Sequence, residues 1–449
     1  MTTKYLISIL IISSLLATAC NKILEEKPDQ SLKIPSGIED MEALLNNSSI
    51  MNDLRLGLGE AFSDNIDLPE EVVNARNEYE RNIYGWKAPI MPADGTLSEA
   101  WSEPYKSIYT CNVVLELAKN LSLNQNNNRL RSVMGRAYFF RAYNYLNLVL
   151  TWRGPLTDAR RHMLAVPIRT QSDMNANNPI STLADVYSQI ESDVLLAISL
   201  LPDQTSVKTI PNKSAGYGLA TRMYLMTGNY EKVNRYADSV LLGENKLLDY
   251  RSLKLSGSYP FPKMNQEVLF HVNGSIPLLA KAVSVGISKF LFDSYLDGDL
   301  RKIGFFVKNV DGTVKFKGSY NGSSSIFTGL ALDEVYLNQV EALVKLGQLK
   351  GAKEKLLGLL NNRYSDDRTK VIEHLDQQAF YSLYKEERRK ELVFRDLRWA
   401  DMQRYYFFDN EWNTFKRKVG GEERVFNTVF FKVPYPENFT VNNPGYIDK

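Results

Sequence analysis

Residues 213–242 read KSAGYGLATRMYLMTGNYEKVNRYADSVLL, and this stretch decides the fold. Apolar residues recur at helical spacing both before Gly228 and after Asn229. Glycine is a common residue just past the end of a helix, and asparagine is a common residue just before the start of one. The stretch therefore predicts two helices, Lys213 to Thr227 and Tyr230 to Leu242, which are joined by a turn at Gly228-Asn229.

The same arrangement recurs around Gly347, between the segments Leu332 to Leu346 and Lys350 to Leu360. When the two glycines are aligned, apolar and aromatic positions of the second helices coincide. The aligned pairs are Tyr230 with Leu349, Val233 with Ala352, Ala237 with Leu356, Val240 with Leu359 and Leu241 with Leu360. Weak internal repeats of this kind are typical of helical hairpins that stack as tetratricopeptide units do.

Two further segments have strong helical patterns. Thr182 to Leu201 begins with a sequence that resembles a capping box, carries apolar residues at steps of three and four, and is followed by Pro202. Arg129 to Leu150 is apolar on nearly every face, which is typical of a helix buried on most sides. The expected fold class is therefore mainly α, built from tetratricopeptide-like helical hairpins.

Residues from about 250 to 329 have a different character. Glycines are spaced among short apolar runs such as Val268-Leu269-Phe270, which indicates loops with a few short strands. Loops held on a rigid scaffold often carry function, because they can vary without disturbing the core. We therefore expect this insertion to form an irregular, loop-rich lobe of the kind in which function often lies.

The first 19 residues have the pattern of a signal peptide. Lys4 supplies positive charge, residues 6–16 are apolar apart from serines, and Ala17-Thr18-Ala19 is typical of a cleavage site. Cys20 follows directly, where a bacterial lipoprotein carries its acylated thiol. We expect a signal peptide over residues 1–19, lipidation at Cys20, a polar tether over residues 20–34 and a body over residues 35–449. Ordinary secretory cleavage is the alternative.

Composition argues against several classes of function. The formal net charge of +2 favours neither nucleic acid nor an acidic polymer as a partner. With Cys20 lipidated, Cys111 has no cysteine left to pair with in the chain. His162, His271 and His374 lack metal-ligand spacing, and the chain contains no nucleophile elbow, P-loop or dinucleotide fingerprint. We expect no metal, no cofactor and no catalytic residue.

Five segments, which together extend over nearly the whole chain, carry the pattern of one protein family. The C-terminal segment, ERRKELVFRDLRWAD at residues 387–401, is the most specific of them. The other four are Cys20 with Leu24 and residues 27–29, followed by a first helix at residues 38–45; Trp101, Tyr105, Ile108, Asn112 and Leu115; GRAYFFRA at residues 135–142, with Tyr145 and Leu148; and VPYPE and NNPGY at residues 433–437 and 442–446.

These five segments resemble the SusD/RagB family of outer-membrane lipoproteins. The resemblance implies an all-helical body, an irregular ligand-binding lobe, and a partnership with a SusC-like TonB-dependent outer-membrane transporter that the lipoprotein covers as a lid. Two departures from the family pattern are visible. Arg136 stands where glutamate is usual, and Arg395-Asp396 replaces a usual Glu-Gly. Without that glycine we expect a straighter helix at this point, and without that glutamate we expect Arg398 to lose one partner.

The residues from 387 to 401 could be mistaken for a paired-carboxylate catalytic site. Glu387 and Glu391 are four residues apart, but arginines interleave with them, which lowers carboxylate pKa values instead of raising one. By helical spacing Glu391 is expected to reach Arg388 or Arg395. We interpret the group as structural ion pairs, formed by Glu387, Arg388, Glu391, Arg398 and Asp401.

Six aromatic residues lie outside helical periodicity, in segments interpreted as loops. They are Tyr84, Trp86, Tyr259, Phe261, Tyr295 and Tyr320. Flat aromatic rings suit the apolar face of a pyranose, so these six are the predicted ligand contacts, and glycans are the favoured ligand class.

The sequence and the resemblance together predict a non-catalytic, lipid-anchored protein on the surface of the outer membrane. It would capture oligosaccharides and deliver them to the SusC-like transporter. Two alternatives remain open at this point: the same importer role for peptides or protein fragments, and a surface glycosidase. A glycosidase requires two facing carboxylates in an open cleft.

Overall fold

A computed structural model describes residues 35–441 apart from 55, 88–97, 122–126, 244–245, 276–285, 311, 319, 324, 412–414 and 427–430. The signal peptide, Cys20 and the tether expected from the sequence lie outside the described residues. None of the helices in the described part of the chain is both long and apolar enough to cross a bilayer.

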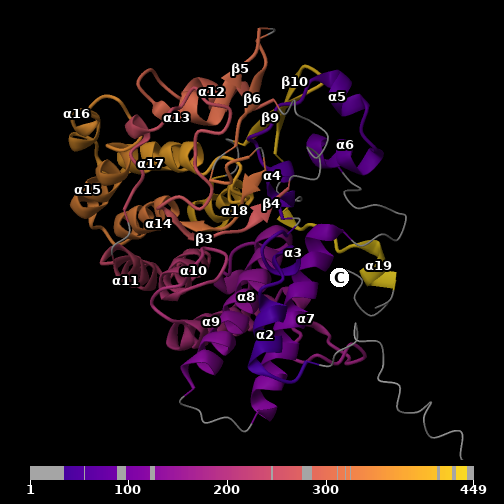
Figure 1. Ribbon diagram of the computed structural model, residues 1–449. Helices are drawn as coiled ribbons and strands as arrows, with labels where there is room; N and C mark the ends of the chain where they lie inside the picture. The colour runs from indigo at the N-terminus through magenta and orange to yellow at the C-terminus, as the bar shows by residue number, and fades with distance from the viewer. Residues whose placement is uncertain are drawn as a thin grey trace, which may run out of the picture.

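Long helices form the body of the protein, and the longest are buried on several sides (Figure 1). Helix α8 packs between α7 and α9, α2 lies against both α7 and α8, and α10 lies against α9. Most residues of α8 are buried, as its apolar sequence predicts. The bounds are α2 (Ile38–Leu45), α7 (Glu99–Asn120), α8 (Asn128–Trp152), α9 (Leu183–Leu200) and α10 (Lys213–Leu225).

The two predicted hairpins are present. Helix α10 packs on α11 (Tyr230–Leu241), and α14 (Leu332–Lys345) packs on α15 (Leu349–Leu360). Gly228 and Gly347 have φ of 66° and 72°, in the left-handed region that glycine enters without strain. Helices α11 and α14 also contact each other, so the hairpins stack side by side. The mainly α fold class with tetratricopeptide-like hairpins is confirmed.

The C-terminal segment differs from the expected straight helix. Helix α17 (Gln377–Glu391) ends before α18 (Arg398–Asp409) begins, and the turn between them holds Phe394 and Asp396 at φ of 54° and 59°. Aspartate is one of the few residues besides glycine that adopt this conformation with modest strain. The prediction of a straighter helix is wrong, because Asp396 takes the conformation that glycine usually supplies.

Between residues 250 and 329 the elements are short. Two antiparallel strand pairs lie here, β4 with β7 and β5 with β6, a third joins β3 to β8 just after residue 329, and α12 packs against α17. The bounds are η3 (Tyr250–Ser252), β3 (Val268–Phe270), β4 (Asn273–Gly274), α12 (Lys289–Ser294), α13 (Leu300–Phe305), β5 (Phe306–Lys308), β6 (Val314–Phe316), β7 (Ile326–Phe327) and β8 (Leu330–Ala331). This lobe occupies the upper part of Figure 1.

The remaining elements are also short. They are α3 (Ser48–Met51), α4 (Leu58–Phe62), α5 (Glu70–Asn74), α6 (Glu78–Gly85), η2 (Asp158–Arg160), β1 (Leu164–Pro167), β2 (Ile180–Thr182), α16 (Thr369–Glu373), β9 (Lys416–Val419), β10 (Glu422–Val425) and α19 (Glu437–Val441). Strands β1 and β2 pair antiparallel, as do β9 and β10. Helix α19 comes back beside α7, far from it in sequence (Figure 1).

Candidate ligand-binding site

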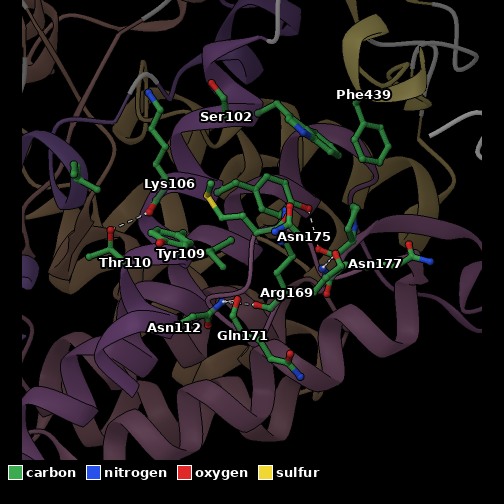
Figure 2. A pocket seen from close by; sticks show the side chains of 18 of the residues that line it. Ser102, Lys106, Tyr109, Thr110, Asn112, Arg169, Gln171, Asn175, Asn177 and Phe439 are labelled. Atoms are coloured by element: carbon green, nitrogen blue, oxygen red, sulfur yellow. Dashed lines mark hydrogen bonds between the residues drawn. The ribbon is translucent and has the colours of Figure 1, made fainter. Parts of the chain in front are cut away.

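A cavity of about 1020 Å³ lies along the N-terminal half of α7. Its other walls are the chain that follows β1, residues 167–178, and helix α19 (Figure 2). We call it the α7 cavity. Aromatic side chains line one part of it and amide side chains line another, so its surface combines apolar area with hydrogen-bonding groups.

The aromatic wall follows from the spacing of residues on α7. Trp101, Tyr105 and Tyr109 are four residues apart, and this spacing places them along one helical face. The ring of Trp101 lies 5.3 Å from that of Tyr105 and 5.1 Å from that of Phe439 on α19. Trp101 is buried, whereas 43% of Tyr109 is exposed. The wall is therefore anchored by packed rings and ends in one accessible ring.

The opposite wall is a loop that is fixed to α7 by Asn112. The Asn112 side-chain amide donates hydrogen bonds to the carbonyls of Arg169, at 3.0 Å, and Gln171, at 3.1 Å. Its amide oxygen accepts a hydrogen bond from Arg141 at 2.9 Å, and Arg141 forms a buried ion pair with Asp193 at 2.7 Å. The loop is thus held by a chain of contacts that reaches into the core, which keeps the cavity preformed.

Two tyrosine hydroxyls add to this attachment. The Tyr145 hydroxyl donates to the Arg169 carbonyl at 2.8 Å and accepts from the Arg169 backbone NH at 2.6 Å. The Tyr105 hydroxyl donates to the carbonyl of Pro167 at 2.9 Å. Both tyrosine rings belong to helices of the body, so the loop rests on rigid elements. The polar side chains that the cavity offers are those of Ser102, Thr110, Gln171, Asn175, Asn177, Asn178 and Asn438.

The charged groups of the α7 cavity are basic. Lys106 pairs with Glu103 at 2.6 Å, and the Arg169 guanidinium donates to the carbonyl of Met174 at 3.1 Å. Among the described residues that line the cavity there is no aspartate or glutamate. The arrangement can therefore stack on a flat apolar ring and hydrogen-bond to hydroxyl groups, and it offers no carboxyl pair for acid–base chemistry.

Most of the aromatic residues predicted from the sequence are buried elsewhere. Tyr84 lies in α6, where the stretch was expected to be irregular, and its hydroxyl donates to the Lys418 carbonyl at 2.8 Å. The Trp86 indole NH donates to the Phe62 carbonyl at 2.9 Å, inside the body. The prediction of exposed rings at Tyr84 and Trp86 is wrong, because both hydroxyl and indole groups bond to neighbouring backbone.

The same correction applies to three aromatics of the loop-rich lobe. Phe261, Tyr295 and Tyr320 are fully buried, and the two tyrosine hydroxyls donate to the Lys390 carbonyl at 2.8 Å and to Glu267 at 2.6 Å. These rings form the core of the lobe, which an aperiodic sequence does not reveal. Tyr259 is 53% exposed, but it does not line the α7 cavity.

Sequence reasoning missed the residues that do line the cavity. Trp101, Tyr105 and Asn112 were noted only for their resemblance to a family helix, and Tyr109 was not singled out. The available signal was three aromatic residues spaced four apart on one face of α7, together with four asparagines among residues 175–178 and 438.

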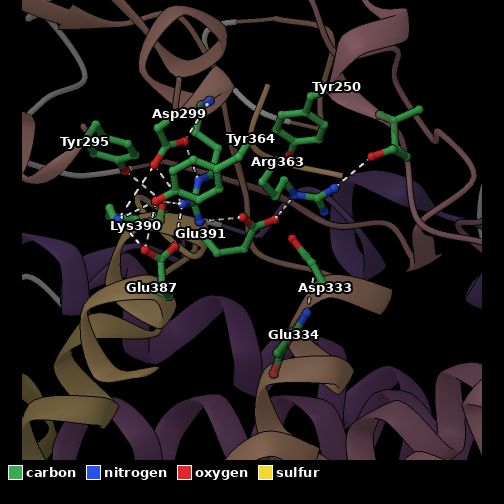
Figure 3. Close-up of polar contacts among 12 residues, drawn as sticks. Tyr250, Tyr295, Asp299, Asp333, Glu334, Arg363, Tyr364, Glu387, Lys390 and Glu391 are labelled. Carbon is green, nitrogen blue, oxygen red and sulfur yellow. Dashed lines mark hydrogen bonds and ion pairs between the residues drawn. The ribbon is translucent and has the colours of Figure 1, made fainter. Parts of the chain in front are cut away.

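The ion-pair group predicted near the C-terminus is buried in the lobe and forms ion pairs with segments that are distant in the sequence. Figure 3 shows Glu387 and Glu391 of α17 facing Arg363 and residues from the start of α13. Glu387 pairs with Arg301 and Lys390, each at 2.5 Å. Burial alone would raise the pKa of Glu387, but these two cations outweigh it and lower the pKa to about 2.

Glu391 has other partners than those expected from helical spacing. It pairs with Arg363 at 2.7 Å and with Arg301 at 3.1 Å, so the expectation of Arg388 or Arg395 is wrong. Arg388 instead pairs with Asp401 across the turn between α17 and α18, at 2.8 Å. The turn ends the helical register before Arg395, and Arg388, which lies in the same helix as Glu391, is bonded to Asp401 instead.

Arg398 retains a carboxylate partner despite the missing family glutamate. Asp64, which follows α4, accepts two hydrogen bonds from it, at 2.7 and 2.9 Å. Arg136 is the other departure from the family pattern. Its guanidinium donates a hydrogen bond to the neutral side chain of Asn46 at 2.5 Å.

Three buried carboxylates converge in the lobe, at Glu267, Asp333 and Glu391, with oxygens within 4.8 Å of one another. Arg363 bridges Glu267 and Glu391 at 2.8 and 2.7 Å. Arg395 pairs with Asp333 at 3.1 Å. Two guanidinium groups thus already stand where a cation would be needed, so the arrangement is a charge network and not a metal centre.

Comparisons with known proteins agree with this architecture. Residues 22–225 match a family model described as starch-binding and associating with the outer membrane, and residues 302–446 match the model of the SusD family. A SusD-like protein P2 of Formosa agariphila is 28% identical over 152 residues, a segment that covers 34% of this chain and only 28% of that relative.

Solved structures show the same fold along most of the chain. A SusD superfamily protein of Bacteroides thetaiotaomicron superposes with a TM-score of 0.72 at 20% identity, and the match covers 91% of this chain and 98% of that one. A SusD-like carbohydrate binding protein of Bacteroides vulgatus gives a TM-score of 0.65 at 19% identity, covering 87% and 88%. The fold is therefore that of the SusD superfamily. With both sequence models matched, the chain belongs to the SusD/RagB family.

Proposed function

We propose that this protein is a non-catalytic surface protein that captures oligosaccharides in the α7 cavity. The observation that supports this most directly is the pairing of an aromatic wall, which ends in the exposed ring of Tyr109, with a wall of amide side chains. A pyranose has one apolar face and a rim of hydroxyls, so it is complementary to both walls at once.

Such a site is expected to bind with modest affinity. Stacking on an exposed ring contributes only about 1 kcal/mol beyond burial, and wet hydrogen bonds contribute little net free energy. A dissociation constant in the range of roughly micromolar to millimolar follows. Asn112 holds the loop in place before the ligand binds, so binding requires little further ordering of the loop. This favours dissociation constants near the micromolar end of the range.

Binding without turnover is part of the proposal. Glycoside hydrolysis needs two carboxyl groups about 5 to 10 Å apart on either side of the scissile bond. The described lining of the α7 cavity offers amides, hydroxyls and two basic groups, Lys106 and Arg169. This lining supports a binding protein over a glycosidase, and it needs no metal or cofactor.

The cellular setting is proposed from the family and from the N-terminal sequence. Cys20 would be acylated after removal of residues 1–19, which would tether the body to the outer membrane at the cell surface. The partner would be a SusC-like TonB-dependent transporter, to which the captured oligosaccharide passes. Modest affinity suits this role, because the ligand must also be released.

The test is calorimetry with a panel of neutral oligosaccharides and Tyr109→Ala, with Tyr259→Ala as the matched control. Both tyrosines are exposed, but only Tyr109 lines the α7 cavity. Tyr109→Ala is expected to weaken binding by about tenfold and Tyr259→Ala to leave it unchanged. Equal effects of the two variants would refute the placement of the site. Products are followed by chromatography, and hydrolysis would refute the non-catalytic role. Binding of peptides alone would favour the importer role for peptides.

A further inference from the structure

A second, smaller cavity of about 360 Å³ lies in the upper part of the molecule, between α12, α17 and the hairpin of β9 and β10 (Figure 1). We call it the β9 cavity. Charged side chains dominate its lining. The residues that line it are Asp64, Ile66, Asp67, Ser288, Lys289, Phe290, Asp293, Arg389, Lys416, Arg417, Lys418 and Glu423.

Two arginines give this cavity a positive wall. Arg417 is buried, and its guanidinium donates hydrogen bonds to the backbone carbonyls of Ala61, Ser63 and Tyr84. Its guanidinium also lies 4.7 Å from the ring centroid of Tyr84. Carbonyl groups and rings stabilise a cation by partial charge only, so Arg417 keeps its full positive charge without a bonded carboxylate.

Arg389 shares the carboxylate of Asp64 with Arg398, which bonds to it more closely. Asp64 accepts two hydrogen bonds from Arg398 and lies 3.2 Å from Arg389, so one negative charge serves two guanidinium groups. Burial lowers the pKa of Arg389 to about 10 and that of Arg417 to about 10, although Asp64 opposes this in both. Both shifts show that the local negative charge is too small to offset the burial of these cations.

The remaining charges of the wall nearly cancel. Lys289 pairs with Asp293, and Lys416 pairs with Glu423 at 2.7 Å. The exposed ammonium of Lys418 offsets Asp67 electrostatically. The hydroxyl of Tyr84 also donates to Asp67, at 3.4 Å. After these pairings the uncompensated charge is positive and belongs to the two arginines.

An apolar surface adjoins this charge. Phe290 lines the β9 cavity with 80% of its surface exposed, so its ring is accessible to a ligand. A ring next to a positive wall is complementary to a sugar unit that carries an anionic group. A guanidinium group attracts carboxylate and sulfate groups by its positive charge, because both are anions with hydrogen-bond-accepting oxygens.

We propose that the β9 cavity binds the carboxylate or sulfate group of an acidic sugar unit, with Phe290 against the sugar ring and Arg389 and Arg417 beneath the anion. This subsite deepens the proposed capture of oligosaccharides and rests on it. It assigns acidic glycans, uronate-containing or sulfated, as the preferred substrate class, on the local charge of this cavity and not on the net charge of +2, which by itself favours no acidic polymer.

The experiment compares three probes by calorimetry on the full chain: a neutral oligosaccharide, a uronate-containing oligosaccharide and a sulfated oligosaccharide. The variants are Phe290→Ala and Lys418→Gln, both at exposed residues of the cavity, so folding is expected to be retained. Lys308→Gln removes an exposed lysine outside the cavity and is the matched control. Far-ultraviolet circular dichroism verifies that each variant keeps its helices.

An acidic probe is expected to bind more tightly than the neutral one, and its affinity is expected to fall with added salt. Phe290→Ala should weaken its binding by about two- to tenfold and Lys418→Gln by about two- to fivefold, whereas Lys308→Gln should not. The uronate and sulfated probes then show which anionic group is preferred.

The outcomes separate this subsite from the α7 cavity. Neutral binding that depends on Tyr109 but no acidic preference, or an acidic preference that none of the β9 variants changes, would overturn the subsite and leave the proposed function standing. Acidic binding that depends on Phe290 and Lys418, with no neutral binding, would support the subsite and refute the α7 cavity. Absence of binding by any probe would overturn both.

Discussion

Two carboxyl groups meet in the interior without a bonded cation, and replacing one of them provides a sharp test of the structure. Glu60 of α4 is buried, and Asp396 lies partly buried beside it in the turn before α18. The backbone NH of Asp396 donates to Glu60 at 3.0 Å, and the backbone NH of Glu60 donates to Asp396 at 3.2 Å. We predict that Glu60→Gln stabilises the protein above neutral pH.

The cause is the burial of Glu60. Burial, followed by repulsion from Asp396, raises the pKa of Glu60 from 4.5 to about 8. Burial likewise raises the pKa of Asp396 to about 7. A carboxyl with a raised pKa holds its proton more tightly in the folded state than in the unfolded state. Its contribution to stability is therefore full below the unfolded pKa and is lost as the pH rises through the folded pKa.

The magnitude follows from the size of that window. One pKa unit corresponds to about 1.4 kcal/mol, so Glu60 alone removes about 2 to 3 kcal/mol of unfolding free energy between about pH 5 and pH 7. Glutamine keeps the shape and cannot ionise. Between about pH 5 and pH 7 the unfolding free energy of Glu60→Gln should therefore fall by about 2 to 3 kcal/mol less than that of the wild type. The altered hydrogen bond costs the variant about 1 kcal/mol at every pH.

The assay is urea unfolding followed by circular dichroism, at about pH 5, 6, 7 and 8, for the wild type and Glu60→Gln. Glu422→Gln, which removes an exposed carboxyl of β10, is the control for a change in net charge. The difference between wild type and variant isolates Glu60 from other groups that titrate in the same range. Parallel pH profiles for wild type and Glu60→Gln would refute the reasoning.

Three further predictions concern the core, the cavity and the anchor. Glu391→Ala should lower the unfolding free energy by about 3 to 5 kcal/mol, because buried Arg301 and Arg363 lose a shared carboxylate, and calorimetric melting would detect it. Folded Glu391→Ala molecules should still bind ligand, so unchanged melting with abolished binding would contradict a structural role. Asn112→Ala should free the loop at residues 169–171 and weaken neutral oligosaccharide binding by about tenfold, and faster hydrogen exchange in that loop would accompany it. Cys20→Ala should abolish incorporation of an alkyne fatty acid and release the protein from membranes, and equal labelling of variant and wild type would exclude lipidation at Cys20.

Local sequence signals predicted the parts of the fold that depend on local physics. Helical spacing with a glycine stop located both hairpins, because φ values of 66° and 72° at Gly228 and Gly347 are nearly closed to other residues. The turn at Asp396 was missed because an aspartate can adopt the left-handed conformation, but its identity alone gives no reliable sign of it.

The site could not be predicted in the same way, because burial depends on contacts between distant segments. Tyr320 follows no helical pattern, yet its hydroxyl bonds to Glu267, 53 residues away, inside the lobe. Tyr109 lies in a regular helix, where periodicity suggests a core position, yet it is 43% exposed. Helical periodicity was therefore a poor guide to exposure, because the aperiodic Tyr320 is buried and Tyr109, in a regular helix, is exposed. Likewise, Glu391 bonds to Arg301, 90 residues away, a partner that helical spacing cannot indicate.

The separation of the α7 cavity from the buried charge network determines which binding experiments are informative. Tyr109 is at the surface, and its removal leaves the packed rings of Trp101 and Tyr105 in place, so lost affinity at unchanged melting would report ligand contact. Glu391 is buried among guanidinium groups in the lobe, and its removal changes stability first. A loss of binding in Glu391→Ala would therefore indicate unfolding unless melting is measured beside it. Variants at exposed cavity residues report ligand contact most directly, because their effect on stability is small.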